Sequence, residues 1–295
     1  MPTFRESLVI TLLSDFGLRD AYVAVMKGVI ASICPAAVTC DLTHEILPQD
    51  ILAARFNLMV AYPHFPEGTV HLAVVDPGVG SARRAIALRC AHGFLVGPDN
   101  GLFSGVLQSS SVLTAVALTN AEYWRVREPS HTFHGRDIFA PAAAHLAGGV
   151  PIEALGDRFD PATLVQPALP TFAQRSERSG QAVRCTGSVQ YIDGFGNLIS
   201  NIPGQAVPDQ PWQIVLETPA GRLRHFSGIK TYSEVPTGTL SALVGSHGWV
   251  EVACSGGNAA QALEIAIGAE VILESRYSRR QRHSSKGEAA PTYDG

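Results

Sequence analysis

The chain has 295 residues, of which 46% are hydrophobic and 16% charged, and its formal net charge is −4. A chain of this size can bury one large or two medium cores. Its negative charge argues against a nucleic-acid partner, and it contains no apolar run of the roughly 18 residues that a membrane span needs. Its five cysteines are scattered and form no C-x-x-C pair. They predict free thiols in a cytoplasmic protein, without a disulfide framework or a metal site.

The first 75 residues alternate between strand and helix patterns. Apolar runs at residues 8–13, 38–42 and 69–75 predict buried strands. Helical spacing of apolar residues begins at Tyr22 and occurs again over residues 50–62. Tyr22 and the other apolar residues of the first helix are expected in the core. The strand–helix–strand order predicts parallel pairing with right-handed crossovers.

Two carboxylates stand at the carboxyl ends of these strands, where open α/β sheets bind ligands. Asp15 follows the first strand, and it could either accept the hydroxyls of a ribose or cap the next helix. Asp76 follows the third strand and opens a proline- and glycine-rich turn that ends in Arg83 and Arg84. The stretch is either a polar turn with a surface ion pair or part of a functional site. There is no glycine-rich phosphate loop, so a nucleoside bound here would carry no phosphate chain.

A third polar loop precedes an alanine-rich helix. Further strands are expected at residues 85–88, 94–96 and 112–118, and His134 then lies just before the helix. The helix N-terminus and Arg136 would both disfavour an imidazolium. His134 is therefore expected to be neutral and able to accept a proton, although a purely structural loop histidine is the alternative.

The composition changes after residue 147. Residues 148–180 are rich in proline and small residues, which favours a linker. Short strand-like runs follow between glycine and proline turns, at residues 188–192, 198–202, 212–217, 240–244 and 249–253. They predict a mainly antiparallel, barrel-like second domain.

The expected fold class is therefore α/β followed by β. An N-terminal Rossmann-like α/β domain with a mostly parallel sheet is expected over residues 1–178. A smaller C-terminal antiparallel β domain is expected over residues 183–276, and a disordered tail over residues 277–295.

Turns of the second domain also carry polar groups. Asn197 can offer its amide to a base or an amino acid and Phe195 a stacking face, although a plain hairpin turn explains the same residues. Ser246 and the glycine-rich turn before Asn258 flank the strand that holds Glu251. The glycines would let backbone groups approach a ligand closely.

Seven stretches taken together resemble one family. They are residues 14–17, 65–70, 74–84, 98–101, 133–141, 193–201 and 257–260. The family is that of the S-adenosyl-L-methionine (SAM) hydroxide adenosyltransferases, or SAM hydrolases, once described as a domain of unknown function and related to the SAM-dependent fluorinase and chlorinase. Several long motifs in the right order, spanning about residues 8–275, make this resemblance more specific than any single motif.

The resemblance implies a homotrimer in which each SAM site lies between the N-terminal domain of one subunit and the C-terminal domain of its neighbour. It places the family's catalytic Asp-Arg-His set on Asp76, Arg83 and His134, and the ribose-binding carboxylate on Asp15. The halogenating relatives differ at the catalytic positions. Because this sequence keeps all three residues, the resemblance favours water as the nucleophile.

The remaining substrate contacts implied by the resemblance fall in the second domain. They are Asp193, Asn197, Ser246, Asn258 and Ala259. The residues themselves add Phe195 and, as a partner for the methionine ammonium, Glu251. One departure is His247, which stands where the halogenating relatives carry arginine.

These observations predict hydrolysis of SAM to adenosine and L-methionine by water or hydroxide attacking C5′. Methionine leaves as a neutral thioether, so no general acid is needed. Arg83 would stabilise hydroxide character, while Asp76 and His134 orient the water or take its proton, with the choice of base left open. SAM is the substrate, and no cofactor, metal, nucleic acid or membrane partner is expected. A halide adenosyltransferase and a SAM or adenosine sensor without turnover are the alternatives.

Overall fold

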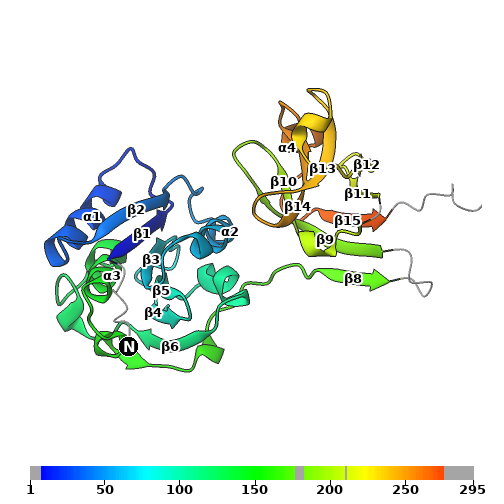
Figure 1. Cartoon of the computed structure of the whole chain (residues 1–295). Helices are drawn as coiled ribbons and strands as arrows, with labels where there is room; N and C mark the ends of the chain where they lie inside the picture. The colour runs from blue at the N-terminus through cyan, green and yellow to red at the C-terminus, as the bar shows by residue number, and fades with distance from the viewer. Residues whose placement is uncertain (1–7, 177–182, 210, 276–295) are drawn as a thin grey trace, which may run out of the picture. The chain divides into compact units, whose positions relative to one another are not determined.

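The computed structural model of the chain describes residues 8–176, 183–209 and 211–275. The chain divides into two compact units, residues 1–168 and residues 169–295, and each has its own sheet and core (Figure 1). An α/β unit is followed by a β unit, which confirms the predicted fold class. The expected tail, residues 277–295, lies outside the described residues.

The N-terminal unit is built on a seven-stranded mixed sheet with the strand order β2-β1-β3-β5-β4-β6-β7. The first four strands in this order run parallel to one another, and the rest pair antiparallel. The strands are β1 (Val9–Ser14), β2 (Val38–Thr43), β3 (Thr69–Val74), β4 (Ala85–Cys90), β5 (Gly93–Pro98), β6 (Val112–Ala117) and β7 (Asp157–Arg158). The parallel part carries the ligand-binding edge that such sheets provide.

Helices cover this sheet. α1 (Tyr22–Ile33) and α3 (Ala140–Ala147) pack against one face, over a core that includes Leu12 and Met26. α2 (Ile51–Ala61) lies on the other side of the sheet in Figure 1. α1 packs on the sheet because its buried residues, Val23, Met26, Val29 and Ile30, recur on one side of the helix, as the spacing predicts.

Residues 148–168 are folded into the N-terminal unit, so the linker prediction is wrong for this part of the stretch. β7 pairs with β6. Arg84 Nη1 donates a hydrogen bond to Thr163 Oγ1 at 2.9 Å, and Val165 N donates to Asp99 Oδ1 at 2.9 Å. Prolines also begin short helical turns, as Pro161 does here, so composition does not distinguish a linker from an irregular packed segment.

The C-terminal unit is an antiparallel sheet that closes almost into a barrel. Its main path is β12-β11-β15-β9-β10-β14-β13, with β8 beside β9. A single bridge between Gly228 and Ala242 joins the two ends of this path. The strands are β8 (Ala173–Ser176), β9 (Val183–Ile192), β10 (Leu198–Pro203), β11 (Trp212–Glu217), β12 (Leu223–Ser227), β13 (Leu240–Val244), β14 (Trp249–Cys254) and β15 (Glu270–Ser275).

The sequence patterns find five of these strands and miss β8, β12 and β15, as well as the short helix α4 (Ala259–Leu263). β12 is missed because only Phe226 among its five residues is buried. An exposed strand has no alternation of apolar and polar residues to detect.

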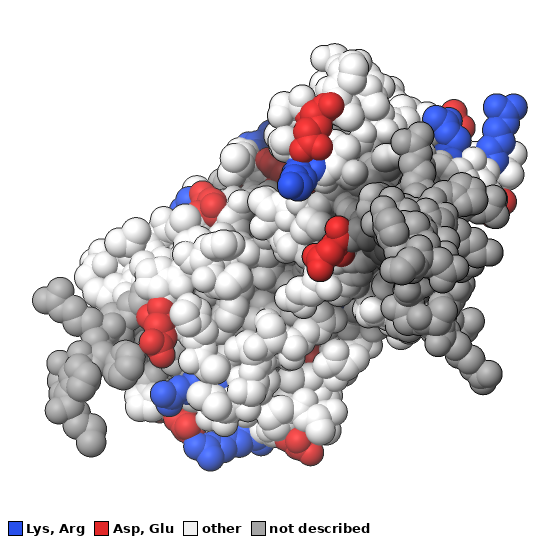
Figure 2. Space-filling view, turned by 45° about the vertical axis from the view of Figure 1, so that its right-hand side comes forward, with Lys and Arg blue, Asp and Glu red and all other residues white. Residues whose placement is uncertain are grey.

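Charged side chains of both signs are interspersed on the face drawn in Figure 2, and most of that face is uncharged. Within the described residues, none of the helices combines the length and the apolar character that crossing a bilayer requires.

A buried histidine predicts acid sensitivity of the fold. His71 on β3 is fully buried, and its Nδ1 lies 2.9 Å from Thr11 Oγ1. Burial, and secondarily the nearby His92, lowers the pKa of His71 from 6.5 to about 4. As the pH falls, the unfolded chain therefore binds this proton first. The unfolding free energy should be fully retained above pH 6.5 and fall towards pH 4, by about 3 kcal/mol from this group.

Urea unfolding of the wild type and of His71→Leu over this pH range tests the expectation. The variant should be less stable at neutral pH but should show a shallower loss on acidification. Parallel pH dependences in the two proteins would contradict it.

Candidate active site

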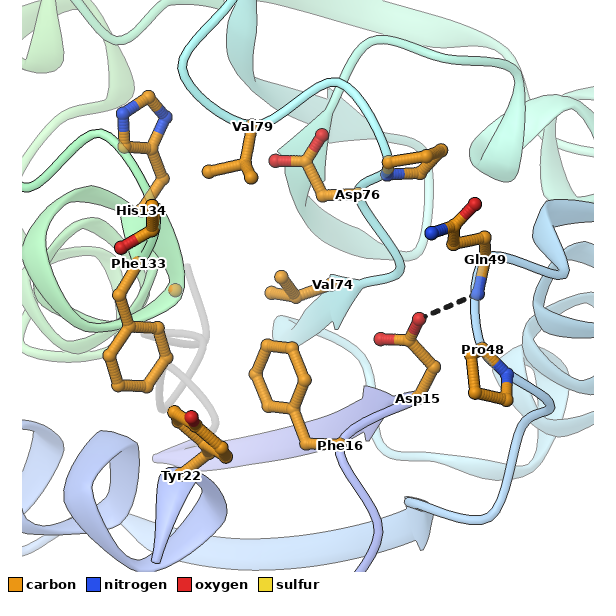
Figure 3. Close-up of a pocket in the computed structure, with 13 residues that line it drawn as sticks. Asp15, Phe16, Tyr22, Pro48, Gln49, Val74, Asp76, Val79, Phe133 and His134 are labelled. Carbon is orange, nitrogen blue, oxygen red and sulfur yellow. Dashed lines mark hydrogen bonds between the residues drawn. The ribbon is translucent and has the colours of Figure 1, made fainter.

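A pocket of about 400 Å³ opens at the carboxyl ends of β1 and β3 (Figure 3). These neighbouring strands run parallel, with Ser14 opposite Val74. The residues that follow them, including Asp15 and Asp76, therefore reach the same edge of the sheet. The other wall comes from residues 132–135, where a π-helical turn (Gly135–Phe139) leads into α3.

Asp15 is held by the loop between β2 and α2. Its Oδ2 accepts a hydrogen bond from Gln49 N at 2.8 Å, and the other carboxylate oxygen remains directed toward the pocket in Figure 3. Gln49 has a φ of 68°, a left-handed conformation that is uncommon for residues other than glycine. Ala21 precedes α1, and no described side chain caps that helix. The capping alternative for Asp15 is therefore wrong.

Arg83 joins the other two predicted catalytic residues. Its Nε donates to Asp76 Oδ1 at 2.9 Å, and its Nη2 forms an ion pair with Asp76 Oδ2. The same Nη2 lies 2.9 Å from His134 Nδ1. Asp76 and His134 line the pocket, whereas Arg83 stands behind them and is 11% exposed. The guanidinium thus acts as a bridge that fixes one side chain relative to the other.

The bond to Arg83 also defines the state of His134. A guanidinium has only donors, so His134 Nδ1 must offer its lone pair and the ring must be neutral with its proton on Nε2. Burial, then the positive charge of Arg83, lowers the pKa of His134 below 6.5. The neutral state of His134 was predicted from the sequence, but burial and Arg83 were not predicted as its causes. Arg136 is instead paired with Asp137, through Nε and Oδ1 at 2.6 Å.

Two contacts hold the loop between Asp76 and Arg83 in place. Asn100 Nδ2 donates to Val75 O at 2.8 Å, which anchors the end of β3 to the loop after β5. Gly80 has a φ of +76°, and a Cβ there would lie 2.5 Å from the carbonyl oxygen of His131. Only glycine allows this approach between the loop that carries Arg83 and the loop that carries His134.

Three aromatic rings form a further wall of the pocket. Phe16, Tyr22 and Phe133 lie with centroids 5.2 to 5.8 Å apart, mostly edge to face. Tyr22 is 50% exposed, so its assignment to the core is wrong. It is the first residue of α1, where the apolar side of the helix runs past the edge of the core and meets the pocket. Sequence reasoning gave none of these three residues a role in the site, although Phe16 and Phe133 adjoin Asp15 and His134.

In the C-terminal unit, Asp193 organises the turn between β9 and β10. Its Oδ1 accepts from the backbone N–H groups of Phe195 at 3.0 Å and Asn197 at 2.9 Å, while its Oδ2 accepts from Asn197 Nδ2 at 2.9 Å. These are the bonds of a hairpin turn, and they use one donor of the Asn197 amide. Phe195 is 79% exposed.

The turn of Asn258 and Ala259 packs beside that hairpin. Ala260 N donates to Gly196 O at 2.9 Å, and a Cβ on Gly196 would collide with the Asn258 side chain. Asn258 itself caps α4 by accepting from Gln261 N at 2.8 Å. The structure therefore brings together the two turns that were singled out separately in the sequence.

Glu251 is almost fully buried, at 2% exposure, and both of its oxygens have partners. The Tyr232 hydroxyl donates to Oε1, and His247 Nε2 lies 2.9 Å from Oε2. Burial and, secondarily, the bond to Glu251 raise the pKa of Tyr232. Ser246 is exposed in the turn between β13 and β14, which also holds His247.

Fold and site together define an α/β protein with an added β-barrel-like unit and a polar pocket at its parallel strand ends. Residues 10–156 match the model of the SAM hydroxide adenosyltransferase N-terminal domain, and residues 187–272 match that of the C-terminal domain. The chain belongs to the SAM hydroxide adenosyltransferase family.

Individual proteins agree with this placement. A protein of Salinispora tropica named (R)-S-adenosyl-L-methionine hydrolase is 42% identical over 261 residues, which cover 88% of this chain and 95% of that protein. A protein of the same name from Thermus thermophilus is 40% identical and is covered over 97% of its length. A solved structure of an uncharacterized conserved protein from Thermotoga maritima superposes with a TM-score of 0.81, at 35% identity, covering 90% of this chain and 99% of that one.

Proposed function

We propose that this chain hydrolyses SAM to adenosine and L-methionine. The observation that carries the proposal is the bridge of Arg83 between Asp76 and His134, at the wall of a pocket that also holds Asp15. The names of the two hydrolases, each similar over most of its length, support the same reaction and the (R) epimer of the sulfonium as substrate.

The reaction balances without a cofactor. The oxygen of a water molecule forms a bond to C5′ while the C5′–S bond breaks, and the bonding pair returns to sulfur. Methionine leaves as a neutral thioether, so the only proton to be moved is the one that the water loses. Holding water and C5′ in line can supply roughly 7–11 kcal/mol of the barrier.

Asp76 is the better candidate for the base. The lone pair of His134 Nδ1 is already taken by Arg83, and Nε2 carries the ring proton. Asp76 Oδ2 accepts from both Nε and Nη2 of Arg83, but Oδ1 accepts only from Nε and so keeps a further lone pair. In this assignment Asp76 accepts the proton of the water and His134 Nε2–H orients its oxygen.

Arg83 acts through both neighbours and places a fixed positive charge beside the water as it becomes hydroxide-like. Asp15, with one oxygen held by Gln49, has the other for the ribose hydroxyls. In the second unit, the contacts with the adenine base and with the methionine part of SAM are assigned to Asp193, Phe195, Asn197, Ser246, Asn258 and Ala259. Because both Glu251 oxygens already have partners, Glu251 is assigned to supporting the Ser246 turn in place of the methionine ammonium.

The direct test is incubation of the purified chain with each SAM epimer in chloride-free buffer, followed by separation of the nucleosides. Adenosine and methionine should form in equal amounts, with faster turnover of the (R) epimer. A halogenated adenosine formed only with added halide would point to a halide adenosyltransferase. SAM binding without any product would point to a sensor.

The lowered pKa of His134 predicts where activity is lost on acidification. Protonated Nδ1 could no longer accept from Arg83 and would set one cation against another. Because the pKa of His134 lies below 6.5, kcat/KM should stay constant down to about pH 6.5 and fall only below it. A pH–rate profile checks this, and His134→Asn should remain active to lower pH. A decline beginning above pH 7 in the wild type would contradict the expectation.

We further infer a homotrimer in which the C-terminal unit of one subunit completes the pocket on the N-terminal unit of its neighbour. Exposed Leu18 and Leu47, close in sequence to pocket residues of the N-terminal unit, support the idea that this surface is covered in the assembly. Light scattering should give about three times the 31.3 kDa of one chain. Co-expression of Arg83→Met with Asn197→Ala, each of which should be much less active alone, should restore part of the activity if subunits share sites. A monomer, or no restoration, would count against the shared site.

The free thiols of all five cysteines support a cytoplasmic location, because reducing compartments keep cysteines in this form.

A further inference from the structure

His44 is a buried histidine that the proposed mechanism does not use. It follows β2 and is 3% exposed. Its Nδ1 lies 2.7 Å from Ser14 Oγ, and its carbonyl oxygen accepts from Gly17 N at 2.8 Å. Ser14 and Gly17 are the two ends of the short turn that carries Asp15 and Phe16 into the pocket. A single residue therefore holds both ends of that turn.

The hydrogen-bond directions are mutually consistent. The Ser14 hydroxyl oxygen accepts from Phe16 N at 3.3 Å, which leaves its own proton for His44 Nδ1. His44 then carries its ring proton on Nε2, which lies 3.1 Å from Asp41 Oδ1 but makes no hydrogen bond of regular geometry. Asp41 is in turn paired with Lys27 at 2.6 Å. These contacts connect the partly exposed Lys27, through Asp41 and His44, to the buried hydroxyl of Ser14.

Serine, histidine and aspartate are the residue types of a hydrolytic triad, but this arrangement does not serve as one. Ser14 is 0% exposed, so no substrate can reach its oxygen. The hydroxyl proton of Ser14 is donated to His44, and the His44 ring is also buried. The cluster is suited to fixing the backbone.

We propose that His44 is a positioning residue for SAM binding, acting through Ser14 and Gly17 on Asp15 and Phe16. The inference rests on the proposed function, because it takes SAM as the occupant of the pocket. The same loop supplies Gln49 N, which holds the Asp15 carboxylate. One segment after β2 thus fixes both the turn and the carboxylate that it presents.

The test compares variants that differ in which ring nitrogen they imitate. His44→Asn keeps an acceptor near the position of Nδ1, whereas His44→Gln keeps an amide near Nε2 and leaves the Ser14 hydroxyl without its acceptor. Ser14→Ala removes the hydroxyl itself. His44→Gln and Ser14→Ala should raise KM about tenfold with kcat little changed, and His44→Asn should largely restore KM. His145→Asn, at a half-buried histidine packed on Tyr123 outside the pocket, serves as the matched control.

The Kd for SAM, measured by calorimetry, accompanies the kinetics. A purely structural role would lower the apparent kcat with the folded fraction and leave KM and Kd unchanged, which would overturn the inference. Equal rises in KM for the Asn and Gln variants would also overturn it, because the Ser14 bond would then be irrelevant. No SAM binding by the wild type would overturn the proposed function and this inference with it, whereas equal Kd values in all variants would overturn the inference alone.

Discussion

Replacement of Arg83 by methionine is expected to lower kcat by about a thousandfold, with a smaller change in the KM for SAM. Methionine fills a similar space but removes the positive charge that the proposed mechanism uses to stabilise the attacking water. It also removes the group that fixes the position of Asp76 relative to His134, because Arg83 bonds to both side chains. The loss should appear in kcat because Arg83 stands behind the pocket lining and contributes little to holding substrate. Steady-state kinetics of adenosine release measures it.

Two further variants make this expectation specific. Arg83→Lys keeps the charge but cannot reproduce the planar fork that reaches two partners, so its kcat should be intermediate. Arg84→Met is the matched control. Arg84 is also paired with a buried carboxylate, Asp99, through Nη2 and Oδ2 at 2.6 Å, but it bonds to Thr163 and not to the pocket. This variant should lose stability and retain kcat. A similar loss of kcat in both arginine-to-methionine variants would contradict the assigned role of Arg83.

The second large effect is an asymmetry between Asp76 and His134. Asp76→Asn should lower kcat by about 10²- to 10⁴-fold, because an amide cannot take the proton from water. It also turns its NH₂ group or its single oxygen toward a guanidinium that needs two acceptors. His134→Asn should cost much less. The asparagine oxygen can replace Nδ1 as the acceptor for Arg83 and so preserve the position of the guanidinium.

The comparison uses single-turnover rates at pH 7.5 with excess enzyme, so that product release does not hide the chemical step. Thermal unfolding of both variants provides the control for folding. If His134→Asn lost far more activity than Asp76→Asn, the roles would be reversed and His134 would be the base. Comparable losses would indicate that the two side chains act as one hydrogen-bonded unit.

The positions of the candidate site residues along the chain were predictable from local patterns. A buried apolar run followed directly by Asp15, and another followed by Asp76, put both carboxylates at the carboxyl ends of strands. Parallel pairing of β1 and β3 then places them at one edge. The neutral state of His134 was also predicted, although burial and Arg83, rather than Arg136, lower its pKa. These features follow from periodicity and from adjacency in sequence, which a single chain displays directly.

Other features were decided only by the tertiary structure. Tyr22 has the spacing of a core residue but stands at the end of α1, where the pocket replaces the core as its neighbour. The bond that makes Arg83 a bridge to His134 joins residues 51 positions apart, and the loop between β2 and α2 reaches back 34 positions to hold Asp15.

The sequence by itself thus determined most of the element types, the two-part architecture and the chemical groups available to the site. The tertiary structure decided which groups already have partners, as for Glu251, and which remain directed toward a pocket, as for one oxygen of Asp15. The physical reason is that hydrogen bonding and burial depend on contacts between distant segments. Local spacing records the face on which a side chain lies, but it does not record what the fold brings against that face.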